Sequence, residues 1–221
     1  YDENGSFTAK AGMAAQVLDA DGNSVKAFAT LDEAFNAAIE GQTVRLLKDL
    51  TEDVTIDKNI TLDLGGKTLT NTGTGKATIT IANGATATVK NGSVVGGTSY
   101  YNIQNNGTAT FEGLTATAGN TGSSMLDNWG TLTIKSGTYT GGLNTVKSEE
   151  GSTLNISGGK FVSDYAPKYN VTGTILVYGA TTISGGEFIQ NSTSTAARTI
   201  VTGVVEGYSS KTYVTGGTFT C

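Results

Sequence analysis

Ile156-Ser157-Gly158-Gly159-Lys160-Phe161 places an aliphatic and an aromatic residue on either side of a tight glycine turn. The same pattern returns at residues 183–188 and 214–219. Complete or degenerate copies also begin at Leu62, Val89, Phe111 and Ile134. Regular self-similarity predicts a solenoid, in which each repeat packs only against its neighbours.

The spacing of these turns indicates which solenoid forms. The second turn residue falls at positions 66, 92, 114, 137, 159, 186 and 217, so the period is 22 to 31 residues. A propeller blade needs about 40 residues. Three short strands joined by tight corners fit the shorter period, and Gly suits such corners because it accepts positive φ. We therefore expect an all-β fold, a single-stranded right-handed parallel β-helix of about seven rungs.

Alternating polarity supports these strands. In Thr131-Leu132-Thr133-Ile134 the aliphatic residues face inward and the threonines face outward. Parallel rungs stack like residues, which predicts an interior aromatic ladder of Tyr139, Phe161, Phe188 and Phe219. The outward Thr-x-Thr pairs resemble ice-binding ladders, but the series decays after Thr133, and the β-propensity of Thr explains it better.

The N-terminal region has a different pattern. An Asp-Gly-Asn turn beginning at Asp21 predicts a hairpin. Thr30 and Glu33 form a capping box that opens a helix from Leu31 to Ile39. We expect residues 1–50 to form a strand hairpin and an α-helical cap, and residues 51–221 to form one continuous β-helix domain.

Composition excludes several classes of function. The chain has no His and a single Cys, Cys221, so it has no intrachain disulfide, no Cys/His zinc site and no histidine-based triad. Its net charge of −5 argues against a nucleic-acid partner. No apolar run approaches the ~20 residues of a membrane span. We expect no cofactor, no metal and no membrane insertion by this segment.

Three stretches resemble a known family: residues 28–38, residues 41–47 and residues 60–69, the last reading Ile-Thr-Leu-Asp-Leu-Gly-Gly-Lys-Thr-Leu. They are similar to the opening of pectin-lyase-like right-handed β-helix proteins. More narrowly, the chain resembles adhesin-like surface proteins of Gram-positive gut bacteria. This resemblance implies an extracellular location at the bacterial cell surface. It does not select a function, because the fold carries lyases, hydrolases and non-catalytic adhesins.

Lyases of this fold place a calcium cluster beside a catalytic Arg, and hydrolases use paired carboxylates. Arg45 lies in the N-terminal region, and Arg198 has no acid nearby in the sequence. The richest acidic run, from Asp49 to Asp57, reads as solvated surface. Glu149 and Glu150 are adjacent and face opposite sides of any strand. We therefore predict that the chain is not an enzyme.

Aromatic residues in the insertions between rungs are the candidate binding residues. Tyr and Trp provide contact area at low entropic cost, as carbohydrate and protein recognition requires. We expect a non-catalytic adhesin-like module that binds glycan or a host surface protein, or that serves as a stalk. The candidates are Tyr100, Tyr101, Trp129, Tyr165, Tyr169 and Tyr208.

Two alternatives remain open. The last repeat could accept a strand from another copy and build head-to-tail filaments, with Val214, Phe219 and Cys221 at the assembly edge. Alternatively, the chain is a polysaccharide lyase or hydrolase. That interpretation requires carboxylates from different rungs, such as Glu112 and Asp127, to lie about 5–9 Å apart in a groove.

Overall fold

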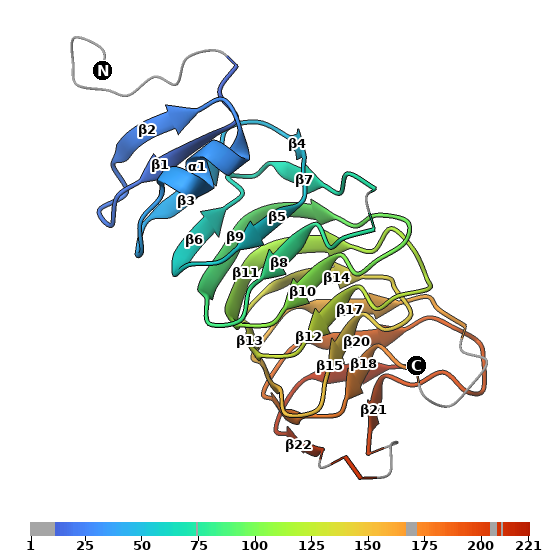
Figure 1. Cartoon of the computed structure of the whole chain (residues 1–221). Helices are drawn as coiled ribbons and strands as arrows, with labels where there is room; N and C mark the ends of the chain where they lie inside the picture. Colours follow the sequence, from blue (N-terminus) through green and yellow to red (C-terminus); the bar gives the residue numbers. More distant parts are fainter. Residues whose placement is uncertain (1–11, 74, 167–171, 204–206, 209) are drawn as a thin grey trace.

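The chain forms a parallel β-solenoid of about six turns in a computed structural model (Figure 1). The structure describes residues 12–73, 75–166, 172–203, 207–208 and 210–221. Seven copies of the glycine turn enclose six intervals, which is why seven repeats give about six turns rather than seven. The hairpin and helix lie at one end, and the last strands lie at the other (Figure 1).

Each complete turn carries three strands, and equivalent strands of successive turns pair in parallel. The strands of the first stack after the N-terminal hairpin are β3 (Thr43–Leu46), β6 (Ile60–Asp63), β9 (Thr86–Val95), β11 (Thr108–Thr117), β13 (Thr131–Ile134), β16 (Thr153–Ile156), β19 (Ala180–Ile183) and β22 (Lys211–Val214). The second stack contains β4 (Leu50–Thr51), β7 (Thr68–Thr70), β14 (Gly137–Thr140), β17 (Lys160–Ser163), β20 (Glu187–Gln190) and β23 (Thr218–Thr220). The long strands β9 and β11 cross the glycine corner and belong to both stacks, which joins them into one sheet.

The third stack forms a separate seven-stranded sheet, which we call sheet B. Its strands are short because each is bounded by a loop and a corner. They are β5 (Val54–Ile56), β8 (Ile79–Ile81), β10 (Ile103–Asn105), β12 (Leu126–Asn128), β15 (Val146–Ser148), β18 (Ile175–Val177) and β21 (Ile200–Thr202).

The glycine turns set the register as the repeat predicts. Leu114 pairs with Gly92 on one side and with Gly137 on the other. A Cβ atom on Gly92 would lie 2.4 Å from Leu64 Cβ and 2.6 Å from the Lys67 carbonyl oxygen. Only glycine fits this approach, so the turn motif fixes the position of each rung against the previous one.

The predicted aromatic ladder forms in the core. Tyr139, Phe161 and Phe188 are fully buried, and their rings stack at 4.9 to 5.0 Å with nearly parallel planes. Phe219 continues the stack at 4.9 Å from Phe188 but remains 40% exposed. The expected alternation is also present, because Leu132 and Ile134 are buried while the threonines of the same strand are not.

The N-terminal hairpin pairs β1 (Ala15–Leu18) with β2 (Ser24–Phe28) in antiparallel fashion. Helix α1 (Leu31–Ala37) follows, and both hydrogen bonds of the Thr30–Glu33 capping box are present. The helix ends earlier than expected, because Ala38 adopts an extended backbone. Ile39 is therefore 67% exposed and not on the buried face that helical spacing predicted. No helix in the described part of the chain is long and apolar enough to cross a membrane.

Candidate functional site

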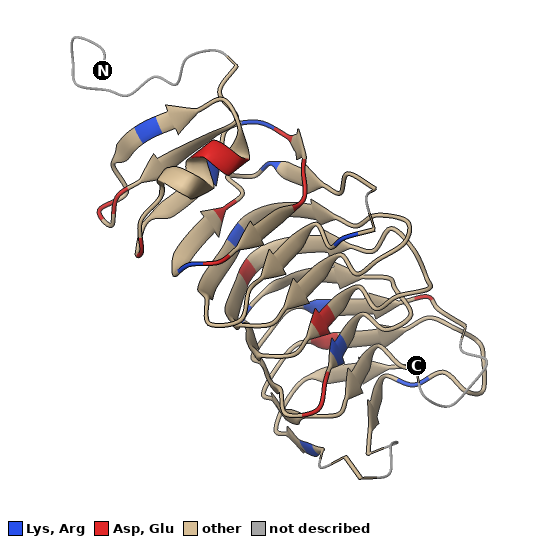
Figure 2. Cartoon of the chain, in the orientation of Figure 1, with Lys and Arg blue, Asp and Glu red and all other residues tan. Residues whose placement is uncertain are grey.

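The outer face of sheet B carries the densest group of polar and aromatic side chains. Strands β10, β12, β15 and β18 pair in register, which places Gln104, Asp127, Lys147 and Leu176 in one column. Their neighbours Leu126, Val146 and Ile175 belong to the core, so this column points away from it. Figure 2 shows the acidic and basic positions that meet on β12 and β15.

A buried amide chain fixes the corner that leads out of β12. Asn105 Nδ2 donates to Asn128 Oδ1 at 2.7 Å, and Asn128 Nδ2 donates to Ser148 Oγ at 3.1 Å. The backbone N–H of Trp129 then donates to the Asn105 carbonyl at 2.8 Å. This corner therefore presents Trp129 at a defined position beside the strand.

Trp129 combines an exposed ring with a fixed polar end. Its indole Nε1–H donates to Asp127 Oδ2 at 2.7 Å, while 53% of the residue remains accessible to solvent. Asp127 itself is fully buried, and Gln104 Nε2 donates to the same oxygen at 3.4 Å. A charge-assisted bond of this kind holds the ring orientation without covering its face.

Asp127 has an unusual electrostatic environment. Its pKa is raised from 3.8 to about 6, chiefly by burial and also by the charge and contact of Glu149, while the Trp129 hydrogen bond and the charge of Lys147 oppose the rise. Asp127 Oδ1 is buried without a hydrogen-bond donor among the described residues. The nearby Glu149 charge disfavours ionisation of Asp127, because two ionised carboxylates repel each other.

Lys147 completes the charged group. Its ammonium forms an ion pair with Glu149. Burial lowers the pKa of Lys147, but the Glu149 hydrogen bond and the carboxylate charges outweigh burial and raise it overall. The lysine is therefore a cation whose charge is balanced locally by Glu149.

Two tyrosines flank this lysine. Lys147 Nζ lies 5.6 Å from the centroid of the Tyr178 ring, and Tyr178 meets Tyr208 edge-on at 5.3 Å. Tyr101 packs edge-on against Tyr100 at 4.9 Å. Burial raises the pKa of both Tyr101 and Tyr178, and for each the charge of Lys147 opposes this effect. Both tyrosines line the same depression of about 220 Å³, in which Lys147 also lies.

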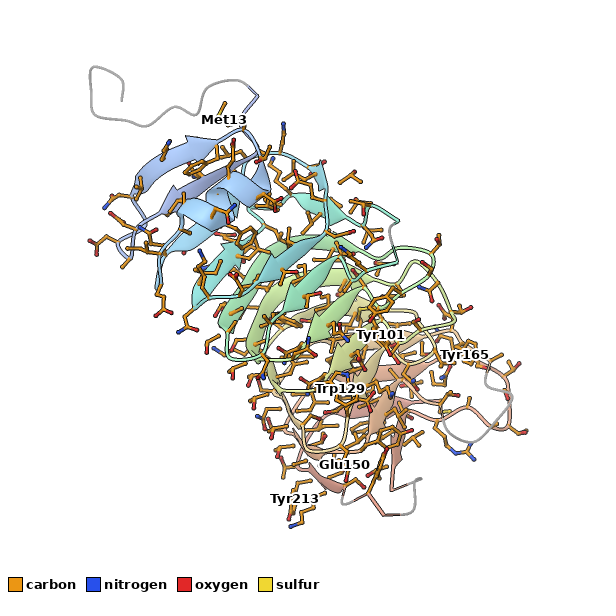
Figure 3. All side chains as sticks on the ribbon, in the orientation of Figure 1. Met13, Tyr101, Trp129, Glu150, Tyr165 and Tyr213 are labelled. Atoms are coloured by element: carbon orange, nitrogen blue, oxygen red, sulfur yellow. The ribbon has the colours of Figure 1, made fainter. Side chains whose placement is uncertain are left out.

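The structure distributes the predicted binding residues unevenly. Tyr101, Trp129 and Tyr208 lie around sheet B, with Tyr100 packed on Tyr101. Tyr165 instead lines a different depression with Asn120 and Gly141 (Figure 3). Tyr169 lies outside the described residues. Sequence reasoning did not single out Lys147. It considered Asp127 only as a possible partner of Glu112, and Glu149 only as the neighbour of Glu150.

The residues tested for lyase or hydrolase chemistry are engaged elsewhere. Arg45 donates two hydrogen bonds to Asp63 Oδ2, at 2.9 and 3.0 Å. Arg198 donates to the backbone carbonyls of Thr195 and Ala197. Glu112 pairs with Lys135 at 2.8 Å on the larger sheet, so it does not share a face with Asp127.

The acidic N-terminal run is dispersed among local contacts. Asp49 accepts from the backbone of Thr68, and Asp53 accepts from Asn71. Burial and the charge of Asp32 raise the pKa of Glu52, within a depression of about 460 Å³. Over the ranges that the structure describes, no three acidic or cysteine side chains gather where they could hold a metal ion.

The residues of the expected assembly edge are exposed in the structure. Val214 is 48% exposed, Phe219 is 40% exposed, and Cys221 is an exposed free thiol. Within the described residues, β22 and β23 each pair with one neighbouring strand only.

Comparison with known proteins adds no relative: no protein-family model, no curated protein and no solved structure matches this chain.

Proposed function

We propose that this chain is a non-catalytic β-helix module of an extracellular bacterial surface protein and that it binds glycan at the outer face of sheet B. The observation that carries this proposal is the half-exposed Trp129 ring, anchored by a buried carboxylate at 2.7 Å. An apolar ring that is held in place in solvent loses little conformational entropy when a ligand covers it.

The surroundings of Trp129 favour a sugar ligand. The C–H face of a pyranose carries partial positive charge, which suits the negative face of an aromatic ring. Gln104, Lys147 and Glu149 supply donors and acceptors for hydroxyl groups nearby. A host protein, the other ligand expected from the sequence, usually requires a surface patch of about 800 Å² on each partner.

The solenoid supports this role mechanically. Successive rungs pair through parallel strands, and the core runs through them. A surface protein built this way displays side chains on a rigid rod, which keeps the loops in place for binding.

The test is a fluorescence titration with bacterial and host glycans, because Trp129 is the single tryptophan of the chain. We expect a saturable change in emission. By calorimetry, Trp129→Ala should weaken binding at least tenfold, which corresponds to about 1.4 kcal/mol. The control is Tyr213→Ala, which removes an exposed aromatic residue from the larger sheet. If no glycan binds, or if both variants bind like the wild type, the proposal is wrong.

End-to-end assembly is a second candidate function, favoured by the open aromatic ladder. Phe219 stacks on Phe188 through one face and stays 40% exposed. A second copy that adds a rung there would bury this ring and pair with the outer edges of β22 and β23. Sedimentation at rising concentration, with and without reductant for Cys221, tests this candidate. A chain that stays monomeric throughout would contradict it.

The catalytic alternative finds less support in the carboxylate geometry. Asp127 and Glu149 come from different rungs but meet in direct contact. The two glycosidase arrangements need separations of about 5–5.5 Å or 6.5–9.5 Å. Release of reducing ends or unsaturated products from the glycans that bind would establish catalysis and overturn the non-catalytic assignment.

A further inference from the structure

The depression between Tyr101 and Tyr178 is distinct from the surface around Trp129. It has a volume of about 220 Å³, and its lining includes Lys147, Asn144 and Thr172. Trp129 lines another depression with Asn106 and Gly107. Asp127 connects the two, since it bonds to Trp129 and contacts Glu149, the partner of Lys147.

The pocket has aromatic walls and a balanced charge. Tyr101 and Tyr178 both lie within electrostatic reach of Lys147. The ammonium is paired with Glu149, and the Asp127 carboxyl adds further negative charge. A ligand carboxylate would therefore meet acidic groups behind the lysine, so the pocket favours an uncharged ligand.

The polar wall of the pocket is already ordered. Asn144 Nδ2 donates to Ser124 Oγ at 3.1 Å, and Asn144 Oδ1 accepts from the Gly173 N–H at 3.0 Å. The Thr172 hydroxyl lies in the same wall, in a residue that is 8% exposed. Its Oγ1 has no hydrogen-bond partner among the described residues. A buried hydroxyl without a partner is uncommon in a folded protein, and a bound hydroxyl group would satisfy it.

We propose that this pocket holds one neutral pyranose ring, the terminal sugar of the glycan that lies along Trp129. This inference rests on the proposed function and adds the class of sugar and its position. The volume lies below the ~300–1,000 Å³ of drug-sized sites, so it takes one ring rather than a chain. The two tyrosines face the C–H groups of the ring, while Thr172 and Lys147 meet its hydroxyls.

The test uses the methyl glycosides of glucose, galactose and N-acetylglucosamine as probes, with saturation-transfer NMR to detect them and calorimetry to measure affinity. We expect at least one probe to bind the 221-residue chain. Tyr178→Ala should weaken its binding about tenfold. Thr172→Val should weaken it about two- to tenfold, the effect of one hydrogen bond.

Thr172→Val separates binding from folding, because it removes a hydroxyl that has no hydrogen-bond partner among the described residues and retains the branched shape of the side chain. Its thermal midpoint should equal or exceed that of the wild type. The control is Tyr213→Ala, an exposed tyrosine on β22 of the larger sheet, which should leave probe affinity unchanged.

The outcomes distinguish the pocket from the wider function. If longer glycans bind through Trp129 but no methyl glycoside binds, the pocket assignment is wrong and the proposed function stands. If a probe binds and its affinity is unchanged by both Tyr178→Ala and Thr172→Val, the pocket assignment is also wrong. Stronger binding of glucuronate or sialic acid than of any neutral probe contradicts the charge argument. If neither glycans nor glycosides bind, both proposals fail.

Discussion

Replacing Asp127 with Asn should stabilise the protein at neutral pH and leave it nearly unchanged at acid pH. The folded protein raises the pKa of Asp127 from 3.8 to about 6. Between these values the folded chain binds a proton that the unfolded chain has released. The stability of the wild type therefore falls as pH rises through this window, and it remains lower above pH 6.

The size of the effect follows from the pKa. A rise of about two pKa units corresponds to about 3 kcal/mol. Solvent contacts the half-exposed Trp129 and the partly exposed Lys147 beside this buried carboxyl, and the resulting screening reduces the expected value to about 1–2 kcal/mol. The Asn side chain imitates protonated Asp127, since its oxygen accepts from Trp129 and its amide donates to Glu149.

The assay is denaturant unfolding of wild type and Asp127→Asn at pH 4 and pH 7.5. We expect the variant to gain about 1–2 kcal/mol over the wild type at pH 7.5 and almost nothing at pH 4. The control Asp57→Asn removes an exposed carboxylate and should stay within about 0.5 kcal/mol of the wild type at both values. A variant that is less stable than the wild type at pH 7.5, or a difference independent of pH, would refute the reasoning.

Three further predictions concern the fold and its reporter. Trp129 emission should titrate with a midpoint near pH 6 in the wild type and should not change with pH in Asp127→Asn. A wild-type emission that is independent of pH would show that the indole does not sense the ionisation of this carboxyl. Phe161→Ala should cost about 3–5 kcal/mol of unfolding free energy by denaturant titration, because the buried ring stacks between Tyr139 and Phe188; a loss below 1 kcal/mol would contradict that packing. Gly92→Ala should lower the free energy of unfolding by about 1–3 kcal/mol or more, since its Cβ would collide with a neighbouring rung. A variant as stable as the wild type would show that the neighbouring rung can shift to accommodate the methyl group.

The register of the larger sheet was predictable because the second residue of the glycine turn has a steric role. Glycine is required where one rung approaches the next, as at Gly92 and Gly137. From position 92 onward the second turn residues therefore occupy equivalent positions, and the residues that follow them align; the first, at position 66, lies one residue early, because Thr68 pairs with Ser93. Tyr139 and Phe161 stack for this reason, as the repeat predicted.

The charged group on sheet B was not predictable from the positions of the glycine turns. Thr131 pairs with Thr153, 22 positions later, but Asp127 pairs with Lys147, which is 20 positions later. The corner after β15 is two residues longer than the corner after β12, so the alignment shifts between faces of one rung. A sequence reader who carried the glycine register backwards would have placed Asp127 opposite Glu149. The direct contact of these two carboxyls arises from side chains that reach across this offset.

The uniform stacking of the rungs also bears on how such a chain changes its length. Residues 138–159 span one full circuit between two equivalent glycines, Gly137 and Gly159. Excising that circuit would bring Lys160 beside Thr115 and preserve the order of buried residues in the larger sheet. The same excision would remove Lys147 and Glu149 from the opposite face. Gene duplication or loss in units of one circuit would thus change the side chains of the proposed binding face and leave the stacking of the core intact, so the two could evolve separately.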